Sequence, residues 1–193
     1  WTAHPDIDCR NCTFYQNGTT IRMYNEPNSQ GPSVFKNNIV YADGAGRSCL
    51  YSRPDVSDYN NLFASGGAVI HPWARDLAGW RSVTGRGAHS TTADPLFADH
   101  ANGDFHLKSE HGRWDPAQTD WVVDGQTSPC IDRGDPTELP DAEPTPNGNR
   151  RNQGVYGGTA QASKSASGRS LYLVSPNWGE VWQSIQQIQW SAL

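Results

Sequence analysis

The sequence has no long apolar run, no block of basic residues and little hydrophobic mass. No stretch approaches the 18 consecutive apolar residues that a membrane-spanning helix needs, so we expect no membrane span. The longest run of Lys or Arg is Arg150-Arg151, and the net charge of −5 gives no electrostatic footprint for nucleic acid. Hydrophobic residues make up 35% of the chain, which argues against a large globular core.

The chain also lacks the common motifs of nucleotide, nucleophile and metal sites. It has no P-loop, no dinucleotide fingerprint and no Gly-x-Ser-x-Gly elbow. A lone Cys-x-x-Cys without a second pair does not make a zinc ribbon. Four histidines lack metal-ligand spacing, namely His89, His100, His106 and His111. We therefore expect no metal site on these residues and no required cofactor, with Ca²⁺ left open as an ion for a polysaccharide-cleaving site.

Sulfur-containing residues are few. Cys9, Cys12, Cys49 and Cys130 are interpreted as small apolar residues stacked inside the fold, and one disulfide among them stays open. The single Met does not stand at position 1, so we expect a removed leader or a piece of a longer chain.

The residues that are abundant are aromatic and turn-forming. Eight Trp, seven Tyr and five Phe are more aromatic mass than a disordered segment carries. The 19 Gly and 13 Pro fit many short strands joined by turns. The composition therefore predicts an all-β protein.

A twelve-residue phrase occurs three times, at 7–18, 33–44 and 56–67, with starts 26 and then 23 residues apart. Each copy has Asn near its middle and ends on Gly. A repeat of this period cannot bury its own apolar face, so it must stack on its neighbours. This predicts a solenoid of about three rungs, each rung being one copy. We expect amide side chains to hydrogen-bond along its axis, from Asn37, Asn38, Asn60 and Asn61.

A short helix is expected to close the solenoid. Asp76 is a candidate N-cap for a helix over 77–83 that ends near Gly85. Leu77 and Trp80 stand at i and i+3, which gives that helix one apolar face for the last rung. By composition the chain divides into rungs (1–67), a C-terminal cap (68–162), a linker (163–170) and a further segment (171–193).

Several phrases resemble a known family. The run ADPLF, NGDFHL, SPCID-x-GDP and NQGVYGGT is similar to the C-terminal end of bacterial secreted right-handed parallel β-helix repeat proteins, often grouped with pectate-lyase-like folds. The resemblance covers about residues 1–162 and implies that fold and a secreted or surface location. The tail LYLVSPNWGEVW–IQWSA looks like the opening strands of an Ig- or fibronectin-like β-sandwich. Residues 171–193 would be an incomplete part of such a module.

The resemblance implies two ways to cleave a polysaccharide. Lyases use Arg or Lys as the base, often with Ca²⁺, and hydrolases use paired carboxylates. Asp6 and Asp8 are two apart on an extended segment, so their side chains share one face about 6.5–7 Å apart, a separation that inverting glycosidases use. Asp58, beside a turn into the third rung, and Arg53, on an outer groove, are further candidates. Each of the four is otherwise an ordinary surface residue, or for Asp6 and Asp8 a minor Ca²⁺ contact.

The tryptophans of the cap region have two interpretations. Exposed indoles stack on sugar rings, so the four could form a shallow carbohydrate platform. Alternatively they fill the core of the cap, where each can bury a large apolar area. The four are Trp73, Trp80, Trp114 and Trp121.

Two classes of function follow. One is an extracellular β-helix module of a larger secreted or surface protein, structural or carbohydrate-interacting. The other is part of a polysaccharide lyase or glycoside hydrolase. Open strand edges at the ends of a solenoid recruit other chains, so we also expect self-association or pairing with another chain.

Overall fold

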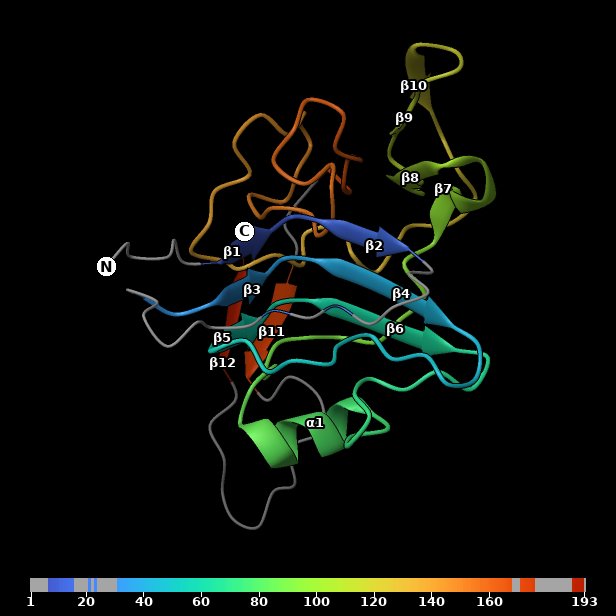
Figure 1. Ribbon diagram of the computed structural model, residues 1–193. Coiled ribbons are helices and arrows are strands. Elements are labelled where there is room, and N and C mark those ends of the chain that lie inside the picture. Colours follow the sequence, from blue (N-terminus) through green and yellow to red (C-terminus); the bar gives the residue numbers. More distant parts are fainter. Residues whose placement is uncertain are drawn as a thin grey trace, which may run out of the picture.

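The structure is a computed structural model that describes residues 7–15, 21, 23 and 31–167, and the backbone of 171–175 and 189–192. The described chain is mostly β, with one α-helix (Figure 1). Its elements are β1 (Asp8–Arg10), β2 (Thr13–Tyr15), β3 (Val34–Lys36), β4 (Ile39–Asp43), β5 (Val56–Asp58), β6 (Asn61–Ser65), α1 (Leu77–Thr84), β7 (Phe97–Asp99), η1 (His100–Asn102), β8 (Asp104–Leu107), β9 (Arg113–Asp115), β10 (Asp120–Val122), β11 (Leu171–Ser175) and β12 (Gln189–Ala192).

Two small parallel sheets hold the three repeat copies. One has the order β1-β3-β5 and the other β2-β4-β6, so each copy gives one strand to each sheet (Figure 1). Two residues join the strands within a copy, and the first has a left-handed backbone: Asn11 (φ 49°), Asn37 (φ 57°) and Tyr59 (φ 54°). Asn adopts this conformation more readily than other non-glycine residues, which explains its place in two of the copies.

The register of the third copy differs from the one predicted. Val34 pairs with Asp8 on one side and with Val56 on the other, so the copies are offset by 26 and then 22 residues. The predicted alignment was therefore wrong by one residue. Tyr59, and not Asn60, takes the left-handed position, while Asn60 aligns with Asn38. A one-residue slip in a strand would exchange its buried and exposed faces, so burial fixes the observed register.

Half of the predicted amide ladder is present. Asn38 and Asn60 are fully buried. Asn60 Oδ1 accepts hydrogen bonds from Asn38 N (2.9 Å) and Asn38 Nδ2 (3.1 Å), and Asn60 Nδ2 donates to the Phe35 carbonyl (2.8 Å). The ladder continues to Cys12, whose N–H donates to Asn38 Oδ1 (2.9 Å), and to Ser90, whose Oγ accepts from Asn60 N (3.1 Å). These bonds join the copies along the stacking direction.

The other two asparagines bond to loops instead. Asn37 Oδ1 accepts from Asp135 N (2.7 Å), and its Nδ2 donates to Glu138 Oε2 (2.8 Å). Asn61 Nδ2 donates to the Ala93 carbonyl (2.8 Å). Their side chains therefore fix the later segments of the chain against the repeat copies.

Each sheet buries one face in the core between them. Phe35 on β3, Val40 on β4 and Leu62 on β6 belong to one buried cluster. The other face of β2-β4-β6 carries a row of rings, in which the Tyr41 centroid lies 5.0 Å from Tyr15 and 4.9 Å from Phe63. These rings lie against the β7–β8 hairpin, so this face is covered as well.

Helix α1 follows the prediction closely. Asp76 is its N-cap and accepts from Gly79 N (2.8 Å), while Gly85 ends it with a left-handed backbone (φ 67°). Leu77 and Trp80 are 4% and 1% exposed and pack on the core cluster. The helix extends one residue beyond the predicted range. The described part of the chain contains no helix with the length and apolar character that a bilayer crossing requires.

All four cysteines are free thiols. Cys49 and Cys130 are fully buried, which fits small apolar residues inside the fold. Burial raises the pKa of Cys9, Cys49 and Cys130 to about 12, so these thiols are poor nucleophiles at neutral pH.

The segment expected to be a linker begins as part of the folded body. Ser163 Oγ donates to the Leu107 carbonyl (2.5 Å), and Lys164 N donates to the Gly112 carbonyl (2.8 Å). Ser165 N donates to the Pro146 carbonyl (2.9 Å). Composition alone did not reveal these bonds because their partners lie far away in the sequence. Within the expected tail module, β11 and β12 pair antiparallel.

Candidate functional site

A tight turn before α1 presents an aromatic side chain to solvent. His71 N and Ala74 N each donate to the other residue's carbonyl (both 2.9 Å), and Ile70 N donates to the Arg75 carbonyl (3.2 Å). Trp73 lies inside this turn with 68% of its surface exposed. The backbone bonds on both sides of Trp73 therefore fix its position.

The buried His71 side chain supports this turn through hydrogen bonds of both ring nitrogens. It is 2% exposed, its Nδ1 accepts from Trp73 N (3.2 Å), and its Nε2 lies 2.9 Å from the Tyr51 carbonyl. Because Nδ1 accepts a hydrogen bond, Nε2 carries the proton that is donated to Tyr51. Burial lowers the pKa of His71, so the ring is neutral at pH 7 and this tautomer persists.

Two exposed aromatic rings meet at His71. The Trp73 and Tyr51 centroids lie 5.0 Å and 6.3 Å from the His71 ring, and Tyr51 is 43% exposed. The exposed Arg53 places its guanidinium carbon 5.5 Å from the Trp73 centroid. We call Tyr51, Arg53, His71 and Trp73 the Trp73 surface. It offers flat apolar faces beside a cation, which suits a ligand with an apolar face and a polar edge.

The other tryptophans of the predicted platform lie elsewhere. Trp80 is 1% exposed within the core, where its indole cannot stack on a sugar, so the core-filling interpretation holds for it. Trp114 and Trp121 face each other across the β9–β10 hairpin with centroids 5.7 Å apart. Lys164 Nζ lies 4.0 Å from the Trp121 centroid and covers that ring. The structure thus brings together Trp73 and Arg53, and not the four indoles.

The predicted acidic residues do not form one site. Asp6 lies outside the described residues. Asp8 is exposed at the start of β1 and accepts from Arg10 Nε (2.7 Å). Asp58 stands at the end of β5, in register with Lys36 and Arg10 and not with Asp8. Asp8 and Asp58 therefore stand at opposite ends of their strands.

Asp58 forms a close pair with His89. Its Oδ2 lies 2.7 Å from His89 Nδ1, and its Oδ1 accepts from the backbone N–H of His89 (2.7 Å) and of Tyr59 (2.9 Å). The His89 ring stacks on Tyr59 at 4.6 Å and 5°. The hydrogen bond to Asp58 raises the pKa of His89. In the neutral form Nδ1 donates to Asp58 and Nε2 is a base, the arrangement of a general-base histidine.

The two residues in register with Asp58, Lys36 and Arg10, both form salt bridges. Lys36 Nζ lies 2.6 Å from Asp135 Oδ2, and Arg10 pairs with Glu138. These pairs hold the loop around residues 135–138 on β1 and β3. Among the described residues no group of three or more acidic, His or Cys side chains has the arrangement of a metal site.

Comparisons with known proteins give one result for part of the chain. A family described as "Disaggregatase related" matches residues 76–134, under a third of the sequence. No curated protein and no solved structure matches the chain. The matched stretch begins at the N-cap of α1 and includes His89 and both antiparallel hairpins up to β10.

Sequence reasoning missed His89 and Tyr51 as parts of these arrangements, and it did not pair His71 with Trp73. His71 stands two residues before Trp73, so a turn centred between them was a usable clue. His89 lies 31 residues from Asp58, and no spacing rule links them.

Proposed function

We propose that the chain is a right-handed parallel β-helix module of a larger secreted or surface protein, and that it binds polysaccharide through the Trp73 surface. One observation carries the binding proposal: Trp73 is 68% exposed on a hydrogen-bonded turn, next to Tyr51 and Arg53. Trp73 and Tyr51 both contact His71 and both expose an aromatic ring, and an exposed patch of neighbouring apolar side chains is typical of an interaction site.

The β-helix proposal is supported by a third set of parallel contacts. Isolated parallel bridges join Ile21 to Leu50 and Ser48 to Val69, on segments that follow the second strand of each copy. A further parallel bridge joins Asn61 to Thr91. Three parallel pairings per copy are what a chain that coils around one axis produces.

Carbohydrate fits the Trp73 surface better than a protein partner does. Sugar rings have an apolar C–H face and polar edges. The Trp73 and Tyr51 rings, which both contact the buried His71, can stack on such an apolar face. Arg53 adds a donor and a positive charge, which favours chains that carry carboxylate or sulfate groups.

Replacing Trp73 with Ala is expected to weaken polysaccharide binding at least about tenfold, or about 1.4 kcal/mol, because one stacking ring is lost. Affinity electrophoresis in gels with pectin, alginate, xylan, cellulose or glycosaminoglycans, with and without Ca²⁺, measures this. Val123→Ala is the matched control, since Val123 is 74% exposed on another segment. Equal retardation of wild type and Trp73→Ala by every retained polymer would contradict the proposal.

The Asp58–His89 pair favours a second candidate function, polysaccharide cleavage. If the chain cleaves, activity is expected to rise with pH through a midpoint above 6.5, because neutral His89 is the base and Asp58 raises its pKa. Asp58→Asn should lower that midpoint, and His89→Ala should abolish activity. Unsaturated products would identify a lyase and new reducing ends alone a hydrolase. An unchanged pH profile in Asp58→Asn would exclude this pair.

A further inference from the structure

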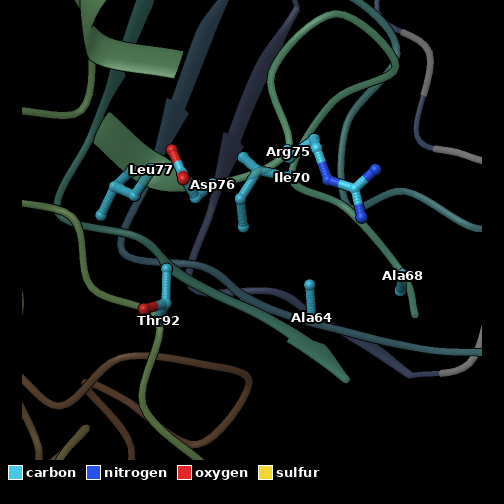
Figure 2. Close-up of a pocket in the computed structure, with 7 residues that line it drawn as sticks. All are labelled: Ala64, Ala68, Ile70, Arg75, Asp76, Leu77 and Thr92. Atoms are coloured by element: carbon cyan, nitrogen blue, oxygen red, sulfur yellow. The ribbon is translucent and has the colours of Figure 1, made fainter. Parts of the chain in front are cut away.

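A pocket of about 160 Å³ opens beside the N-terminal end of α1 (Figure 2). Four aliphatic and three polar side chains line it: Ala64, Ala68, Ile70, Leu77, Arg75, Asp76 and Thr92. Its lining residues include Ala64 of β6 and Leu77 of α1. No residue of the Trp73 surface lines it, although Arg75 is only two residues from Trp73.

The floor of the pocket is the edge of the hydrophobic core. Ile70 and Leu77 are 2% and 4% exposed and belong to the core cluster, against which Ala64 and Ala68 pack. The small Ala side chains leave the space open, since a larger residue at either position would fill it. A floor made of core residues is held in place by packing and needs no rearrangement to accept a ligand.

The mouth of the pocket has hydrogen-bonding groups available for a ligand. Asp76 Oδ1 accepts from Gly79 N (2.8 Å), which holds the carboxylate in place. Neither the Arg75 guanidinium nor the Thr92 hydroxyl takes part in a hydrogen bond or ion pair within the described part of the chain, and both residues are exposed. Figure 2 shows Arg75 beside Ile70 on one side of the space and Thr92 across it.

We propose that this pocket binds one sugar ring that carries an oxyanion group, a carboxylate or a sulfate. The inference rests on the proposed function and names its ligand class. Arg75 pairs with the oxyanion, since guanidinium binds such groups in a fork. Asp76 and Thr92 bond to ring hydroxyls, and the C–H face of the ring lies on Ala64 and Ala68.

Size and charge exclude the main alternatives. A cavity of about 150 Å³ holds one benzene molecule, so this open pocket can take the ring of one sugar only with its substituents at the mouth, and it has no room for a nucleotide. A bare cation would be repelled by the positive charge of Arg75, and a purely apolar ligand would make no use of the Arg75 guanidinium or the Thr92 hydroxyl. The helix end itself does not attract the anion, because Asp76 already caps it with a negative charge.

Methyl NMR of alanine-labelled protein tests the pocket directly. Glucuronate and a sulfated glucose are the probes, and glucose is the neutral comparison. We expect the Ala64 and Ala68 methyl signals to shift with at least one charged sugar, and to shift far less with glucose at equal concentration. Which charged probe acts separates a carboxylate from a sulfate ligand. Arg75→Gln should weaken this binding at least about tenfold, while Arg133→Gln, an exposed arginine on another loop, should not.

The outcomes separate this inference from the proposed function. Trp73→Ala should leave the methyl shifts unchanged while it weakens polymer binding. Polymer binding that depends on Trp73, without any shift of Ala64 or Ala68 at millimolar sugar, would overturn the pocket and leave the proposed function standing. If the methyl shifts are unchanged in Arg75→Gln, the proposed pairing of Arg75 with the oxyanion of the sugar is wrong. If charged sugars shift the methyl signals but no polymer retards the protein, only the claim that the Trp73 surface binds polysaccharide would be overturned.

Discussion

Replacing Asn60 with Ala is expected to lower the free energy of unfolding by about 3–5 kcal/mol, because buried groups lose their partners. Asn60 is fully buried and bonds to two groups of Asn38 and to the Phe35 carbonyl. The substitution leaves the Asn38 N–H and the Phe35 carbonyl without these bonds, and each unsatisfied buried group costs about 1–3 kcal/mol. Urea unfolding followed by circular dichroism measures the change.

Asn102→Ala is the matched control for this prediction. Asn102 is exposed in η1, and its side chain bonds locally to Asp99 Oδ2 (2.7 Å). We expect a change within about 0.5 kcal/mol, as for most surface substitutions. A loss below about 1 kcal/mol in Asn60→Ala would show that the amide ladder does not hold the copies together.

Replacing Glu143 with Gln is expected to stabilise the protein at pH 8 by up to about 3 kcal/mol and to have little effect at pH 4. Glu143 is 6% exposed, and burial, with Asp132 nearby, raises its pKa to about 7. Its Oε1 accepts from Asn152 N and Gly158 N (both 2.8 Å), and a Gln oxygen can keep both bonds. The amide also removes a buried charge.

The sign follows from proton binding. The folded state holds the Glu143 proton up to about pH 7, whereas the unfolded chain releases it near the ordinary glutamate pKa of 4.5. Wild-type stability from this group is therefore complete below pH 4.5 and falls as pH rises to 7 and above. Urea unfolding at several pH values should show this slope flattened in Glu143→Gln. A variant less stable than wild type at pH 8 would contradict the assigned burial penalty.

Local patterns in the sequence predicted helix α1 well. Its cap, its apolar pair and its terminal glycine lie within ten residues, and each acts on its neighbours. The repeat was found for the same reason, but the register of its third copy was predicted one residue away from the observed one. Asn60-Asn61 offers two similar side chains, and only the buried pairing of Asn60 with Asn38 decides between them.

Contacts between residues far apart in the chain could not be predicted from the sequence. The pairs Asp58 with His89 and Arg53 with Trp73 depend on how the fold places segments 31 and 20 residues apart. Trp80 shows the limit for single residues, because an indole at a helical i+3 position suits either a platform or a core. Only the packing of α1 on the last copy places it inside. Pairing of strand edges with another chain stays a prediction.

A glycan array probed with the whole chain tests the central claim most directly, with Trp73→Ala on a parallel array. The account predicts that wild type binds a set of polysaccharide fragments enriched in charged sugars and that Trp73→Ala loses most of this signal. Wild-type protein that is folded by circular dichroism and binds no glycan would contradict the proposed function. So would a binding pattern that Trp73→Ala leaves unchanged.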